Sequence, residues 1–91
     1  MAKYGATLMH GARGGDRRFE FDGPDDLMAH SPMTVMRRFM EHLDDTARLG
    51  HIDYQVNAAM KNEKYQVVTV LGDLTFAKGD HQPFVCMIAP D

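Results

Sequence analysis

The stretch Ser31–Gly50, SPMTVMRRFMEHLDDTARLG, is the only part of the chain with an unambiguous helical period. At about 100° per residue, its apolar side chains fall within an arc of roughly 160°, and the polar ones lie opposite. The apolar arc consists of Met33, Val35, Met36, Phe39, Met40, Leu43 and Ala47. Ser31 is placed to cap the helix, Pro32 occupies its first position, and Gly50 provides a left-handed stop. The stretch therefore predicts an amphipathic helix whose apolar side needs a partner layer.

On both sides of this helix, apolar and polar residues alternate with the period of half-buried strands. Five strands are expected, at Lys3–His10, Arg17–Phe21, Ile52–Met60, Tyr65–Phe76 and Pro83–Ile88. In the third strand, Ala58 and Met60 are expected to continue the face of Tyr54. In the fourth, Gly72 predicts a bulge or a bend.

The resulting element order is ββαβββ, and its short connections favour antiparallel neighbours. We therefore expect an α+β fold: a single antiparallel sheet of about five strands with one amphipathic helix packed across one face. The chain has 91 residues and no repeat or linker, which predicts one domain over residues 1–91. A domain of this size buries only about 60–65% of its unfolded surface, so oligomerisation would add to a thin stability margin.

The last two strands carry apolar residues on both faces, whereas a sheet covered by one helix should have one dry and one polar face. The residues expected on the face away from the helix are Val68, Val70, Val85 and Met87. A second copy of the chain would cover them, so these four residues are the predicted interface of a homodimer. In the alternative interpretation, Leu27, Met28 and the N-terminal residues wrap round and cover them within one chain.

Composition argues against several classes of function. Thirteen acidic against ten basic residues give a formal net charge of −3, without the basic stripe that nucleic-acid binding needs. The longest apolar runs are too short to span a bilayer. Cys86 is the single cysteine, and the start of the chain shows no pattern of a cleavable leader. We therefore expect no nucleic-acid or membrane partner, and a location in the reducing cytoplasm.

His51 and Asp53 are the candidate catalytic residues. They are two positions apart, which places them on one face of a strand, where they can form a base–orienter pair or two metal ligands. Two polar residues on the wet face of a strand also need no such role. The paired Cys and helical His spacings of zinc sites are absent from the sequence. We therefore expect no metal and no cofactor.

Arg13, Arg17 and Arg18 form the one basic cluster, around the glycines of a predicted hairpin turn. Glycine-rich backbone with flanking arginines can cradle an anion, so these three residues are the candidate anion site. The segment lacks the spacing of a phosphate loop and does not lead into a helix. An ordinary hairpin turn is therefore the competing interpretation.

Taken together, these patterns predict a small soluble protein that acts by binding or assembly as a homodimer. The alternative is a small enzyme or ligand carrier whose site lies in a cleft between helix and sheet or between subunits. An enzyme should gather two or three titratable groups in one cleft, whereas a binding module should spread its polar residues over the surface. The sequence does not identify a small-molecule or protein partner other than a second copy.

Overall fold

In the computed structural model, the chain forms one antiparallel five-stranded sheet and one long helix, which confirms the expected α+β fold and the order ββαβββ. The structure describes the backbone of residues 1–11, 15–46 and 50–91, and the side chains of all of these except 15 and 16. The elements are β1 (Ala2–His10), β2 (Gly15–Gly23), the 3-10 helix η1 (Leu27–Ala29), α1 (Pro32–Thr46), β3 (Asp53–Asn62), β4 (Val67–Thr75) and β5 (His81–Pro90).

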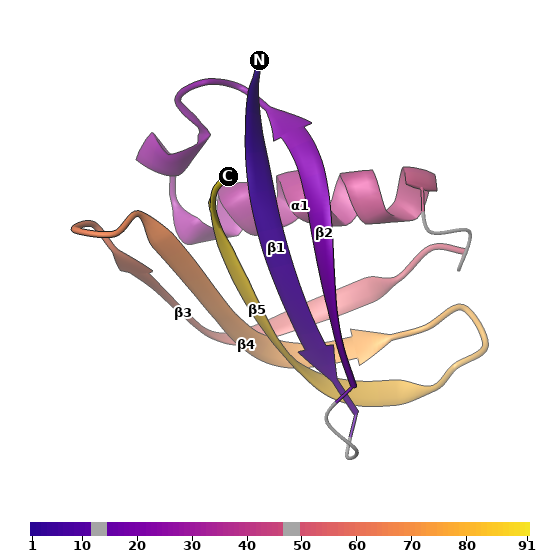
Figure 1. The fold of residues 1–91 in the computed structure, drawn as a ribbon. Coiled ribbons are helices and arrows are strands. Elements are labelled where there is room, and N and C mark those ends of the chain that lie inside the picture. The colour runs from indigo at the N-terminus through magenta and orange to yellow at the C-terminus, as the bar shows by residue number, and fades with distance from the viewer. Residues whose placement is uncertain (12–14, 47–49) are drawn as a thin grey trace.

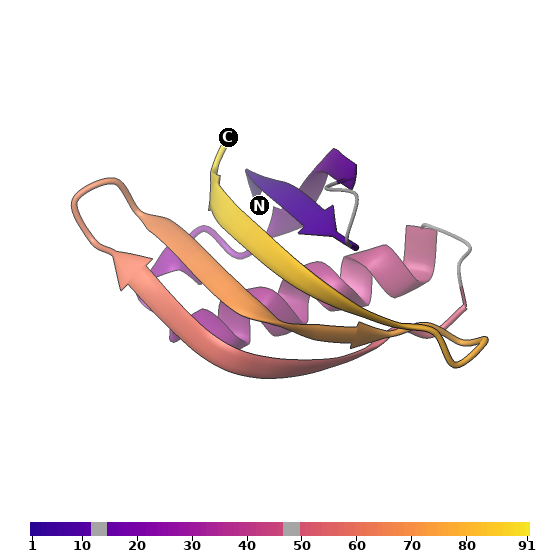
Figure 2. The same ribbon diagram turned by 90° about the horizontal axis from the view of Figure 1, so that it is seen from below.

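The strands lie side by side in the order β2-β1-β5-β4-β3. The first and last strands of the chain are therefore neighbours inside the sheet, and α1 connects one edge of the sheet to the other. The sheet is strongly twisted and curls round one side of α1, so that β1 crosses the helix steeply while β3 runs nearly along it (Figure 1). Seen from below, α1 lies behind β3, β4 and β5 (Figure 2). No helix in the described part of the chain is long and apolar enough to cross a membrane.

The ends of α1 agree with the sequence pattern where the structure describes them. The backbone N–H of Thr34 donates to Ser31 Oγ at 3.3 Å, which is the predicted N-cap. Gly50 has a φ of 73°, a left-handed conformation, but residues 47–49 between it and the end of α1 lie outside the described residues, so its role as the helix stop stays a prediction. Ala47 and Arg48 lie outside the described residues. Met33 is 42% exposed, so its predicted place in the buried arc was wrong.

The core lies between α1 and the covered face of the sheet. Fully buried residues of α1 pack there: Val35, Met36, Phe39, Met40 and Leu43. The sheet contributes Tyr4, Ala6, Leu8, Val68, Val70, Leu74, Phe84, Cys86 and Ile88. Leu27 and Met28 of η1 are buried on this same side, next to Tyr4. They therefore cover more of the helix side, and the alternative in which they wrap over the other face was wrong.

A β-bulge in β3 changes which residues face the helix. The register shifts between Val56 and Ala58, so Asn57 is the extra residue of β3. Val56 pairs with Gly72 on the helix side, whereas Ala58 pairs with Leu71 on the other side. Ala58 and Met60 thus do not continue the face of Tyr54, and that prediction was wrong. The predicted irregularity at Gly72 exists, but the partner strand carries the extra residue while β4 stays continuous.

Gly72→Ala is expected to be strongly destabilising because the backbone of β3 occupies the space of a side chain. A Cβ at position 72 would lie 1.9 Å from the carbonyl oxygen of Gln55. Relieving this overlap requires a backbone shift, which should lower the free energy of unfolding by at least about 2–3 kcal/mol. Gly5→Ala is the matched control in another strand, because its new Cβ would meet only the movable end of the Arg18 side chain. Equal urea midpoints for the two variants would contradict the bulge.

Candidate functional site

The face of the sheet turned away from α1 carries its own apolar strip. The register of β4 and β5 pairs Thr69 with Met87 and Leu71 with Val85 on this face. These two pairs form two parallel rows across the strands. Met60 of β3 pairs with Thr69 and extends the first row, and Met9 of β1 pairs with Val85 and extends the second. These six residues, Met9, Met60, Thr69, Leu71, Val85 and Met87, are called the open face below.

The predicted dimer residues divide between the two faces of the sheet. Val85 and Met87 lie on the open face, as expected. Val68 and Val70 are 0% exposed, because they pair with Ile88 and Cys86 under α1. Their placement on the same face as Val85 and Met87 was therefore wrong. The sequence pattern correctly identified both faces of β4 as apolar, but it placed Val68 and Val70 on the face away from the helix.

Large apolar side chains are concentrated on the open face. Seven such side chains are exposed among the described residues, and four of them, Met9, Met60, Leu71 and Met87, belong to the open face. Met60 is the most exposed of the four, at 60%. Methionine is flexible and polarisable, so it can adapt its shape to a partner surface. In known proteins, exposed apolar strips of this kind are often contact surfaces.

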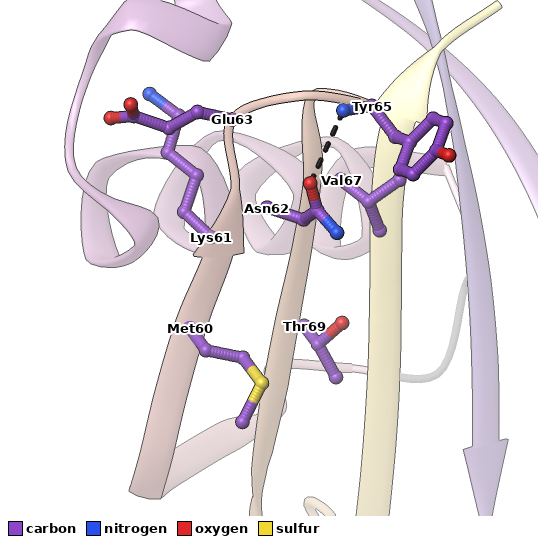
Figure 3. Close-up of a pocket in the computed structure, with 7 residues that line it drawn as sticks. All are labelled: Met60, Lys61, Asn62, Glu63, Tyr65, Val67 and Thr69. Carbon is purple, nitrogen blue, oxygen red and sulfur yellow. Dashed lines mark hydrogen bonds between the residues drawn. The ribbon is translucent and has the colours of Figure 1, made fainter.

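A hollow of about 660 Å³ extends the open face toward the hairpin between β3 and β4. Met60 forms its floor together with Thr69 and Val67, and the ring of Tyr65 stands at its rim (Figure 3). The backbone N–H of Tyr65 donates to Asn62 Oδ1 at 3.3 Å, which holds the turn. A second hollow, of about 490 Å³, lies at the opposite end between Met9 and Leu71. Both ends of the strip are thus recessed and can receive side chains of a partner.

Charged residues lie at the rim of the open face. Arg18 reaches across Gly5 and donates to Asp91 Oδ1 at 2.6 Å, beyond the first row of the strip. Asp73 follows Leu71 at the other end, close to the side-chain amide of Asn57. An apolar centre with a polar rim is the usual anatomy of a protein–protein interface.

His51 and Asp53 do lie side by side, as the sequence predicts, and a third residue joins them. His51 Nε2 is 2.8 Å from Asp53 Oδ1, and Nδ1 is 2.8 Å from Asp44 Oδ2 of α1. The other Asp44 oxygen accepts the backbone N–H of Ile52 at 3.2 Å. Only the imidazolium has two N–H groups, so the charged form satisfies both carboxylates. These bonds and the nearby negative charges raise the pKa of His51 above its ordinary value of 6.5.

This cluster is a clasp between α1 and the start of β3. The His51 side chain is 70% exposed, and Asp53 is exposed to a similar degree. Both side chains are therefore open to water. The sequence did not predict that Asp44 joins this cluster, because the helical period places Asp44 on the solvated side of the helix.

The clasp should make stability depend on pH near neutrality. Because the pKa of His51 is raised on folding, its contribution is fully present below 6.5 and is lost as the pH rises through the folded value. The urea midpoint of wild type should therefore fall as the pH rises from 6.5 through the raised pKa of His51, and His51→Gln should flatten this slope. A wild-type slope that persists in His51→Gln would contradict the clasp.

Two of the three candidate anion residues, Arg17 and Arg18, lie on opposite faces of β2. Arg13 lies outside the described residues. Arg17 pairs with the buried Leu8 and so faces the helix side, whereas Arg18 lies on the opposite side and is bonded to Asp91. Their separation follows from the strand period, because neighbouring residues point to opposite faces.

Cys86 and the acidic and histidine side chains offer little for nucleophilic or metal chemistry. Burial raises the pKa of the Cys86 thiol to about 12, so it stays protonated and unreactive. Among the residues that the structure describes, no group of three or more His, Cys, Asp or Glu side chains is arranged to hold a metal ion.

The open face is thus an apolar surface that no described element of the chain covers. It offers apolar contact area, with recesses at each end and charges at the rim. Comparison with known proteins adds no assignment: no protein-family model, curated protein or solved structure matches the chain.

Proposed function

We propose that this protein is an assembly module that pairs with a second copy of itself through the open face. The observation that carries the proposal is the strip of methionine, leucine and valine side chains at the centre of a sheet face that no described element covers. The helix α1 already packs on the other side of the same sheet, so a second sheet can pack only on the open face.

Burial on the open face gives a driving force for association. Burying a fully exposed large apolar side chain contributes roughly 1.5–3 kcal/mol. The four large apolar side chains of the open face are 37–60% exposed, so each contributes part of this value, and a two-fold pairing buries two copies of each. The molecule measures 35 × 24 × 19 Å, so its broadest side is comparable in size with the approximately 800 Å² per partner that a stable interface typically buries.

A second copy fits this surface better than a charged partner. The strip itself carries no charged side chain, and the rim carries both signs, with Arg18 and Asp73 at different ends. Nucleic acid would need a positive surface, which an acidic chain with a net charge of −3 does not provide here. Two sheets can pack face to face at about 10 Å with interdigitating side chains, as in β-sandwiches.

Sedimentation equilibrium at micromolar concentration tests the proposal. Wild type should have a mass near twice 10.3 kDa. Met87→Asp should be a monomer, because pairing of this variant would bury an aspartate carboxylate from each copy in the interface. Met33→Asp is the matched control: Met33 is 42% exposed and Met87 43%, but Met33 lies on α1. This variant should remain a dimer.

Two results would contradict the proposal. One is a wild-type protein that remains a monomer over the whole micromolar range. The other is a dimer that Met33→Asp disrupts as strongly as Met87→Asp, since that outcome would place the interface on the helix.

A further inference from the structure

A separate cavity of about 410 Å³ lies on the helix side of the sheet, where the ends of β1 and β5 meet the β4–β5 turn. Its principal lining residues are His10, Arg17, Phe76, Lys78, Asp80 and Gln82. The register confirms the side: Arg17 pairs with buried Leu8, and His10 pairs with buried Phe84. The cavity therefore opens on the face opposite to the open face and is independent of the proposed dimer.

The polar and aromatic walls of this cavity are held in place before any ligand arrives. His10 Nδ1 donates to Gln82 Oε1 at 2.7 Å, which leaves the amide group of Gln82 free to donate. The His10 ring packs against Phe76, with ring centroids 5.9 Å apart. The turn beyond Phe76 is closed by two backbone bonds, from Phe76 N–H to the Asp80 carbonyl and from Gly79 N–H to the Phe76 carbonyl. Preorganised walls lower the entropy cost of binding.

The charge of the lining is positive in an otherwise acidic chain. Arg17 and Lys78 contribute two cations, against the single carboxylate of Asp80. The Arg17 guanidinium lies 5.3 Å from the centre of the Phe19 ring, a contact that orients it without neutralising its charge. A planar guanidinium and a flexible ammonium on one cavity are well suited to a carboxylate.

We propose that this cavity binds a small organic monocarboxylate with an aromatic body. The carboxylate lies between Arg17 and Lys78, and the body stacks on Phe76 above the His10–Gln82 pair. The volume is within the range of small-molecule sites, which combine an apolar wall with a few polar groups.

A titration with benzoate, followed by ¹⁵N NMR, tests this site. Benzoate should shift the backbone signals of Gly11, Ala77 and Gly79, with a dissociation constant in the range of about 0.1–10 mM expected for so small a ligand. Benzamide has the same shape without the charge, and acetate has the charge without the ring. Each should bind at least about fivefold more weakly than benzoate.

Charge variants identify the cavity as the place of binding. The double variant Arg17→Gln with Lys78→Gln should weaken benzoate binding roughly five- to tenfold. The control, Arg37→Gln with Lys64→Gln, makes the same change of charge at exposed positions elsewhere and should bind like wild type. Met87→Asp should also bind like wild type, so failure of the dimer and failure of this site are distinguishable.

Three outcomes would overturn the proposal. The first is the absence of shifts around the β4–β5 turn at millimolar benzoate. The second is equal binding of benzamide or acetate, which would remove the role of the cations or of Phe76. The third is equal loss of binding in the control double variant, which would show that only the overall charge matters.

Discussion

Phe39→Ala is expected to lower the free energy of unfolding by about 3–5 kcal/mol, which approaches the whole stability of a small domain. Phe39 is 0% exposed and lies at the centre of α1's buried side. Its ring packs against Phe19 and Phe21 of β2, both at 5.6 Å between centroids. Truncation therefore leaves a cavity between the helix and the edge of the sheet, and urea denaturation measures its cost.

The control for this variant is Asp45→Ala, on the exposed side of the same helix. It should change the urea midpoint little, because surface substitutions that break no specific contact are nearly neutral. Asp44→Ala is unsuitable as a control, since Asp44 bonds both His51 and the backbone of Ile52. Equal midpoints for Phe39→Ala and Asp45→Ala would show that the buried side of α1 is misassigned.

Val68→Asp is expected to prevent folding, whereas Met87→Asp is expected to leave the fold intact. Val68 is 0% exposed under α1, so aspartate there would bury a carboxylate without a partner, at a cost of about 3–5 kcal/mol or more. Met87 lies on the open face and is 43% exposed, so the same charge stays in water in the monomer. Far-UV circular dichroism at low concentration distinguishes the two. A folded Val68→Asp and an unfolded Met87→Asp would reverse the assignment of the two faces.

The secondary structure follows from local patterns in the sequence. The stretch Ser31–Gly50 combines a cap, a proline at the first turn and an apolar arc, and these signals agree in predicting a helix. The strands have a clear period of two, with turns rich in glycine and charge. Such signals depend on residues near in sequence, which is why they predict the elements and the antiparallel sheet.

The pairing of the elements was not predictable in the same way. The contact between β1 and β5 joins the two ends of the chain, and no local pattern specifies it. The bulge at Asn57 reverses the faces of Ala58 and Met60, and it depends on the backbone of β3 approaching Gly72. A strict alternation in the sequence therefore gave the wrong face for half of β3.

The candidate site shows the same limit. Alternation showed that both faces of β4 are apolar, but only the register with β5 shows that Val68 and Val70 face α1. His51 and Asp53 were predictable from their spacing, whereas Asp44 joins them from another element. The acidic and basic residues around the 410 Å³ cavity likewise come from segments distant in sequence.

The most direct test of the open-face dimer is an isotope-filtered NOE experiment on a mixture of ¹³C-labelled and unlabelled protein. Pairing through the open face predicts intermolecular NOEs from the methyl group of Met87 in one copy to the methyl groups of Leu71 and Val85 in the other. The methyl group of Met33, on α1, should show none. Intermolecular NOEs to Met33, or none from Met87 in a protein that sediments as a dimer, would contradict the account.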